Sequence, residues 1–183
     1  IMWIATIKGL YSYNGSITNK VLLTDINPNI SIISIHLDKM GRKWLGTTKG
    51  LIKYDSRIGK EDIFLYNTAD GLISNIIYDI CTIPGGIATA SPNGLNVFKN
   101  YNSWISYPYE SDDYNGCAYD YNKEALWAST TRSGINLIDI ESGEVIETVT
   151  INNGLSNNEV LNISIDNSSN LWVATDGGGV SVS

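Results

Sequence analysis

The sequence predicts an all-β fold assembled from repeated units of four antiparallel strands. First, a phrase that runs from Trp through a small residue and Thr to Gly-Leu recurs five times, with variations, and its glycines lie 40–45 residues apart. Second, apolar and polar residues alternate ahead of the phrase, as they do in a strand. Third, the 183 residues include 11 Tyr, 5 Trp and 17 Gly, which suits strands joined by tight turns. Such a period is typical of β-propeller blades. The repeat glycines are Gly9, Gly50, Gly94, Gly134 and Gly179.

The second repeat shows the strands of one blade most clearly. Apolar and polar residues alternate over residues 33–37, and the Asp-Lys-Met-Gly stretch at 38–41 supplies a turn. Four antiparallel strands in about 40 residues make one blade. In the third repeat this turn is shorter, and we align Ile87 with the Trp of the other copies. The remaining strands of the second repeat are expected at residues 43–47, 51–54 and 63–66.

The chain is expected to hold four repeats and a surplus half, because it contains four inner strands but five copies of the Trp strand. We therefore predict about four blades plus a partial one, as a segment of a larger propeller of seven or eight blades. A four-bladed closure and an eight-bladed ring made by two chains are the alternatives. Bare sheet edges would pair with other propeller blades or with a second chain. The blade pieces are expected at about residues 1–27, 30–67, 76–108, 115–151 and 160–183.

The composition argues against several classes of partner. The formal net charge is −7 and the isoelectric point is near 4.6, so a phosphate backbone would be repelled and no nucleic-acid partner is expected. No apolar run approaches the roughly 20 residues that span a bilayer, and no signal-peptide pattern opens the chain. Membrane attachment is therefore expected only through parts of the parent protein outside this chain. No residue pattern calls for a cofactor.

The two cysteines are expected to be buried free thiols. They are too few for a disulfide framework and lack the spacing of a metal knuckle. Cys81 and Cys117 are assigned to equivalent positions of successive inner strands, which would place them in neighbouring blades and not side by side. We expect each to act as a small apolar side chain.

Residues that recur at the same place in each repeat are assigned to the scaffold. The repeated Trp is flanked by small residues, which favours packing between blades over sugar stacking. Trp104 lies outside this register, and rim packing and a partner surface are equally favoured for it. The repeated Asp occupies the inner hairpin turn, so turn chemistry explains it better than a pair of catalytic carboxylates. The residues concerned are Trp3, Trp44, Trp127, Trp172, Asp38, Asp120 and Asp166.

His36 is the single histidine of the chain. No second His and no acidic cluster accompanies it at metal-ligand spacing, so the sequence predicts neither a metal site nor a catalytic residue. A structural histidine is favoured, and a binding role in a channel lining comes next.

The whole repeat resembles a known family. An alternating strand is followed by Asp-x-x-Gly-x-x-Trp-apolar-Gly-Thr-x-x-Gly-Leu-x-x-Tyr-Asp and then by Asp-Gly-Leu-x-x-Asn. This order is similar to the two-component regulator propeller repeat. The match is closest at Asp38–Asp55 with Asp70–Asn75, and at Asp166–Val180. The resemblance covers essentially the whole chain, although the third copy lacks the Trp.

The resemblance implies a function that spacing alone does not reveal. Such repeats occur in the periplasmic sensor regions of hybrid two-component systems of Bacteroides-type bacteria, where propellers precede a small β-sandwich, a membrane helix and a histidine kinase. Many members detect oligosaccharides. The resemblance therefore implies a non-catalytic, periplasmic, ligand-sensing segment whose parent protein would carry the kinase.

Polar residues that differ between repeats are the candidates for ligand binding. In a four-stranded blade, the loop between the second and third strands and the crossing to the next blade open on the same face. Variable polar groups on a rigid repeated scaffold are where specificity arises, and a sugar needs such donors and acceptors. The candidates are Lys49, Asn75, Asn93, Arg132, Asn157 and Asp176.

Two alternatives to ligand sensing stay open from the sequence. One is a structural or protein-docking propeller, whose acidic rim and open edges bind other protein domains. The other is part of a metal-dependent propeller lyase, in which a His and carboxylates surround a divalent metal. His36 would supply only part of such a site.

Overall fold

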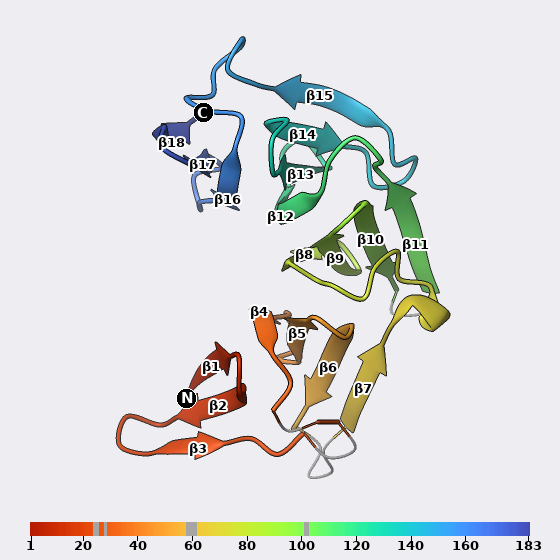
Figure 1. Ribbon diagram of the computed structural model, residues 1–183, viewed down its shortest axis with the longest axis vertical. Coiled ribbons are helices and arrows are strands. Elements are labelled where there is room, and N and C mark those ends of the chain that lie inside the picture. Colours follow the sequence, from red (N-terminus) through yellow and green to blue (C-terminus); the bar gives the residue numbers. More distant parts are fainter. Residues whose placement is uncertain (24–25, 28, 58–61, 101–102) are drawn as a thin grey trace.

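The computed structural model describes residues 1–23, 26–27, 29–57, 62–100 and 103–183. Its strands form five antiparallel sheets that follow one another along the chain. Figure 1 shows these sheets arranged as blades along an open arc, with the N-terminal and C-terminal blades at its two ends. The protein is therefore an all-β propeller segment, as the repeats predict.

Over these described residues, blades 2, 3 and 4 contain four strands each, and blades 1 and 5 contain three. Blade 1 is formed by β1 (Met2–Thr6), β2 (Gly9–Tyr13) and β3 (Thr18–Lys20). Blade 5 is formed by β16 (Val160–Ile165), β17 (Leu171–Thr175) and β18 (Gly179–Val182). Blade 2 is formed by β4 (Ile32–Leu37), β5 (Lys43–Thr47), β6 (Leu51–Asp55) and β7 (Asp62–Tyr66). Blade 3 is formed by β8 (Asp79–Ile83), β9 (Gly86–Ser91), β10 (Gly94–Lys99) and β11 (Ser103–Pro108). Blade 4 is formed by β12 (Tyr114–Asp120), β13 (Ala125–Thr130), β14 (Ile135–Ile138) and β15 (Val145–Val149).

The second blade matches its predicted strands to within one residue at each compared end. Its inner strand β4, like β8, β12 and β16, faces the centre of the arc in Figure 1. One short 3-10 helix, η1 (Thr68–Asp70), lies in the crossing from blade 2 to blade 3. Within the described residues, no helix has the length and apolar character needed to cross a membrane.

Three of the repeated Trp side chains, Trp3, Trp44 and Trp127, pack between blades as predicted, whereas Trp172 in blade 5 is 44% exposed. Trp44 has no exposed surface and lies in a buried cluster that joins blade 2 to blade 3. Its ring stands edge-on to that of Phe98, with 6.1 Å between centroids and 71° between planes. Trp127 joins blade 4 to blade 5 in the same way. Trp104 stacks on Phe98 at 4.5 Å, so of the two roles considered for it the structure supports packing. Large buried aromatic rings of this kind dominate core energetics.

The third blade corrects the predicted alignment by one residue. The Thr47 hydroxyl donates to the carbonyl three residues further on at 2.6 Å, and Ser91 makes the same contact in blade 3 at 2.9 Å. The residue three places before this hydroxyl is Trp44 in blade 2 and Ala88 in blade 3. Ala88, and not Ile87, therefore occupies the Trp position. The inner turn of blade 3 is shorter than that of blade 2, which displaced the alignment.

The two cysteines do not occupy equivalent positions, so this prediction is wrong. Cys81 pairs with Ala88 at the Trp position of its blade, whereas the residue that pairs with Trp127 is Ala118. Cys117 is one residue away from the equivalent place, and successive side chains of a strand point to opposite faces. The two thiols therefore face each other between blades 3 and 4, within one buried cluster. Both are free and buried, as predicted.

A buried carboxylate connects the inner turn of blade 2 to its Trp. The Oδ1 atom of Asp38 accepts the backbone N–H groups of Met40 and Arg42, at 2.9 and 3.0 Å. The Oδ2 atom accepts Arg42 Nε at 2.6 Å and the indole N–H of Trp44 at 2.9 Å. The predicted turn role is confirmed, and the bond to the indole is an additional function of the same side chain.

The same arrangement recurs near the surface of blade 5. Asp166 accepts the N–H groups of Ser168 and Asn170, at 2.8 and 2.9 Å, and the indole N–H of Trp172 at 2.9 Å. In blade 4, Asp120 accepts two backbone N–H groups of its own turn. Local turn chemistry therefore accounts for all three repeated carboxylates.

Replacing Asp38 with Ala would remove the buried acceptor of four hydrogen bonds. We expect the free energy of unfolding to fall by about 3–5 kcal/mol, because one member of a buried charge pair is lost. The matched control is Asp166→Ala, which removes the same kind of acceptor where water replaces it, and a smaller loss is expected. Urea unfolding followed by Trp fluorescence measures both. Equal losses would contradict the role given to burial.

The same carboxylates predict a loss of stability in acid. Hydrogen bonds from Trp172 and Asn170 lower the pKa of Asp166 to about 2. Burial opposes such a shift at Asp38, but the bonds from Trp44 and Arg42 lower its pKa below the ordinary value, near 3.9. A lowered pKa in the folded state adds stability that is complete above about pH 4 and is lost as pH falls through that pKa.

We therefore expect Tm to change little between about pH 7 and 5 and to drop between about pH 4 and 2. Circular dichroism melts measure this, and the Asp38→Asn variant should show a shallower drop. A Tm that holds steady down to the lowest pH would contradict the prediction.

Candidate functional site

The loops that carry the candidate residues lie on one face of the arc. In blades 2 and 4, the loop between the second and third strands bonds to the crossing into the next blade. The Ile77 N–H donates to the Thr47 carbonyl at 3.0 Å, and the Gly134 N–H donates to the Asn158 carbonyl at 3.0 Å. In blade 5 the corresponding loop bonds to the crossing that precedes it. The common face of these loops is confirmed, and their role in binding stays a prediction.

Arg132 is presented by a loop that Asp112 organises. The Asp112 side chain is 1% exposed, whereas that of Arg132 is 76% exposed. Asp112 accepts the Arg132 N–H at 2.8 Å and the Ser133 hydroxyl at 3.0 Å, and it also accepts the Thr131 hydroxyl. Burial opposes the shift, but these bonds lower the pKa of Asp112. A buried anion therefore fixes the loop, and the Arg132 guanidinium is largely exposed, with its Nε 3.8 Å from Asp112 Oδ1.

Asn93 lies next to this loop, on the turn of blade 3. Its φ of 67° is left-handed, a conformation that Asn tolerates in tight turns. Its N–H donates to Asp113 Oδ1 at 3.3 Å, and its carbonyl accepts the Tyr109 N–H at 2.8 Å. Because Asp113 directly follows Asp112, the structure brings the loops of Asn93 and Arg132 together.

Asn75 and Asn157 instead cap loop backbones. Asn75 Oδ1 accepts the Thr68 N–H at 2.9 Å. Asn157 Oδ1 accepts the Glu159 N–H at 3.1 Å, and its Nδ2 donates to the Asp176 carbonyl at 2.5 Å. These amides hold the crossings in place, with both polar side-chain atoms of Asn157 and the side-chain oxygen of Asn75 engaged in doing so.

Lys49 and Asp176 are exposed on the same face. The backbone N–H of Lys49 donates to the Thr47 hydroxyl at 2.9 Å, which orders its loop. The six candidates therefore divide into three exposed charged side chains, one turn residue and two backbone caps. Asp112 was missed by sequence reasoning, and the acidic pair at 112–113 just ahead of an inner strand was the available signal.

His36 joins two inner strands. Its Nε2 lies 2.5 Å from the hydroxyl of Thr82 on the neighbouring blade. Burial lowers the pKa of His36, which keeps the imidazole neutral at pH 7. The ring also lines a hollow of about 350 Å³ on the inner strands, together with Asp79 and Asn162. Over the part of the chain that the structure describes, no three His, Cys, Asp or Glu side chains are grouped so that they could hold a metal ion.

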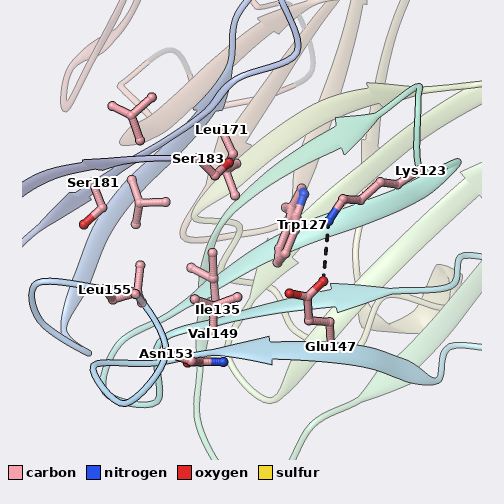
Figure 2. Close-up of a pocket in the computed structure, with 13 residues that line it drawn as sticks. Lys123, Trp127, Ile135, Glu147, Val149, Asn153, Leu155, Leu171, Ser181 and Ser183 are labelled. Atoms are coloured by element: carbon pink, nitrogen blue, oxygen red, sulfur yellow. Dashed lines mark hydrogen bonds and ion pairs between the residues drawn. The ribbon is translucent and has the colours of Figure 1, made fainter.

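A second hollow, of about 260 Å³, lies between blades 4 and 5. Figure 2 shows Trp127 in its wall, with the Lys123–Glu147 ion pair at one side. At the corresponding place between blades 2 and 3, Trp104 of the fourth strand fills the space. Blade 5 has three strands, so this hollow lies where a fourth-strand side chain would pack. We therefore do not count it among the candidate ligand sites.

Comparison with known proteins supports the fold and the repeat. Residues 154–177 match the family described as two component regulator propeller. A histidine kinase of Formosa agariphila is 29% identical over 113 residues, which are 54% of this chain and 8% of the kinase. The chain thus spans less than a tenth of that relative.

Solved structures extend the likeness to nearly the whole chain. The extracellular domain of a one component system from B. thetaiotaomicron is 22% identical, with a TM-score of 0.77 over 99% of this chain and 26% of that one. The extracellular domain of a hybrid two component system from the same organism is 17% identical, with a TM-score of 0.77 over 98% and 26%. At these identities the likeness shows the propeller fold. The chain is therefore a β-propeller segment, and its residues 154–177 are similar to the two-component regulator propeller repeat.

Proposed function

We propose that this segment belongs to the extracellular or periplasmic sensor region of a two-component system and binds a ligand without catalysing a reaction. The observation that carries the proposal is the family repeat at residues 154–177. The similarity of the chain to a histidine kinase and to extracellular domains of one- and two-component systems supports the proposal. Catalysis by the repeated carboxylates is disfavoured, because hydrogen bonds within their own turns account for them.

The ligand that fits the loop face best is an oligosaccharide, in our proposal one with an acidic group. Arg132 offers an exposed planar cation that suits bidentate contact with a carboxylate or sulfate. Lys49 and Asp176 add an exposed donor and acceptor on the same face. Asp112 holds the Arg132 loop before any ligand arrives, which reduces the entropy cost of binding.

A docking role is the second candidate, and the open end of blade 5 favours it. Trp172, Val180 and Val182 are 44%, 62% and 51% exposed. In blade 2 the counterparts of the first two, Trp44 and Leu51, are fully buried by the next blade. An apolar face of this kind would bind a further blade or a second chain.

Titration of the complete extracellular region with a panel of neutral and acidic oligosaccharides tests the proposal. We expect calorimetry to detect an acidic oligosaccharide, and Arg132→Ala to weaken its binding about 10- to 100-fold through loss of a charged hydrogen bond. Lys39→Ala is the control, because Lys39 is exposed in the inner turn on the opposite face. Equal weakening by both variants, or no binding of any oligosaccharide, would count against the proposal.

Asp112→Asn tests whether the buried anion positions Arg132. We expect hydrogen exchange at residues 131–133 to speed up about tenfold or more, because a charged acceptor of several hydrogen bonds is weakened. Exchange in the turn of Asp38, far along the chain, serves as the internal control. Unchanged exchange at 131–133 would show that the loop is held by other contacts.

A further inference from the structure

The two cysteines form a close pair between the inner strands of blades 3 and 4. Cys81 is 8% exposed and Cys117 is 4% exposed, and both belong to one buried cluster. The Sγ atom of Cys117 lies 3.8 Å from the carbonyl oxygen of Ala88. Ala88 is the register partner of Cys81 on the adjoining strand. The Cys117 sulfur therefore lies against the pair of strands, β8 and β9, to which Cys81 belongs.

Local contacts fix this geometry. The backbone N–H of Cys117 donates to Asp79 Oδ2 at 3.0 Å, which ties β12 to β8 two residues from Cys81. Ala88 replaces the Trp found at this place in the other blades, so no large ring separates the thiols. A hydrogen bond with the Cys81 thiol, together with burial, raises the pKa of Cys117 well above its usual range. Few thiolates are then present at neutral pH, and the folded dithiol reacts slowly.

We propose that Cys81 and Cys117 form a reversible disulfide that joins blades 3 and 4 when the chain meets a disulfide oxidant such as oxidised glutathione or an oxidised dithiol protein. One cysteine thiolate attacks the oxidant and forms a mixed disulfide, and the second cysteine displaces the reduced oxidant. The two S–H bonds are lost and one Sγ–Sγ bond forms. The two electrons and two protons reduce the oxidant disulfide to two thiols.

The position of the two cysteines determines how an oxidant reaches them and how a disulfide between them affects stability. Both cysteines line the hollow on the inner strands, which offers a small oxidant an approach. The bond would close the chain between residues 81 and 117 and so restrict the unfolded state. An exported propeller meets oxidising conditions, under which such a bond persists.

Refolding the denatured chain in a glutathione redox buffer, with a parallel sample in a phosphine reductant, tests the proposal without any ligand. We expect the oxidised chain to be lighter by two hydrogen atoms. Unreduced proteolysis should release one linked pair of peptides that contain Cys81 and Cys117. The oxidised protein should melt roughly 5–10 °C above the reduced protein.

The Cys81→Ala and Cys117→Ala variants are the matched controls, and their Tm should not respond to the reductant. Two free thiols per chain after oxidative refolding, or disulfides only between chains, would overturn the proposal. A Tm shift of equal size in a single-Ala variant would also overturn it. If a variant does not fold, the peptide map of the wild-type chain decides alone.

Discussion

A blade of this protein can bury its Trp-bearing face only against the blade that follows, as blades 1, 2 and 4 do, and the rest of the structure depends on this constraint. Trp44 is fully buried because blade 3 covers it, whereas Trp172 at the end of the arc is 44% exposed. A single four-stranded sheet has no second layer of its own with which to cover such a face. Stability is therefore the sum of what each blade contributes and what each interface adds, as in other repeat proteins. The Asp38 carboxylate strengthens one such interface, because the same group closes the turn and fixes the indole.

The interface between blades 3 and 4 solves the same packing problem with other residues. Blade 3 has lost both the inner-turn Asp and the Trp, and it presents Ala88 and Cys81 instead. Blade 4 fills the space from its side with Tyr114 and Tyr119, and Tyr109 stacks on Tyr114 at 4.7 Å. Large side chains on one face opposite small ones on the other keep the total volume near that of a well-packed core. The loss of the repeat signature in blade 3 is thus compensated by the neighbouring blade.

Features set by local sequence signals could be predicted, and features set by the folded chain could not. The strands of blade 2 follow from alternation and turn residues, which are local signals. The alignment of Ile87 failed because a shorter turn shifted the strand. The assignment of Cys81 failed with it, because a slip of one residue moves a side chain to the opposite face of the sheet. The common face of the candidate loops follows from topology. The role of Asp112 does not, because its partners lie about 20 residues away in sequence, and only the folded chain brings them together.

The blade 3–4 interface also connects the proposed ligand face to the inner strands. At the loop face, Arg132 is bound to Asp112, and the adjoining Asp113 accepts the N–H of Asn93 from blade 3. At the inner face, Asp79 of blade 3 accepts the N–H of Cys117 from blade 4. The Asn93–Asp113 bond and the Asp79–Cys117 bond cross the same boundary between the two sheets. A displacement of one blade against the other therefore changes both bonds. A ligand that draws Arg132 toward it would therefore act on the packing around the cysteine pair, and a disulfide there would resist that movement.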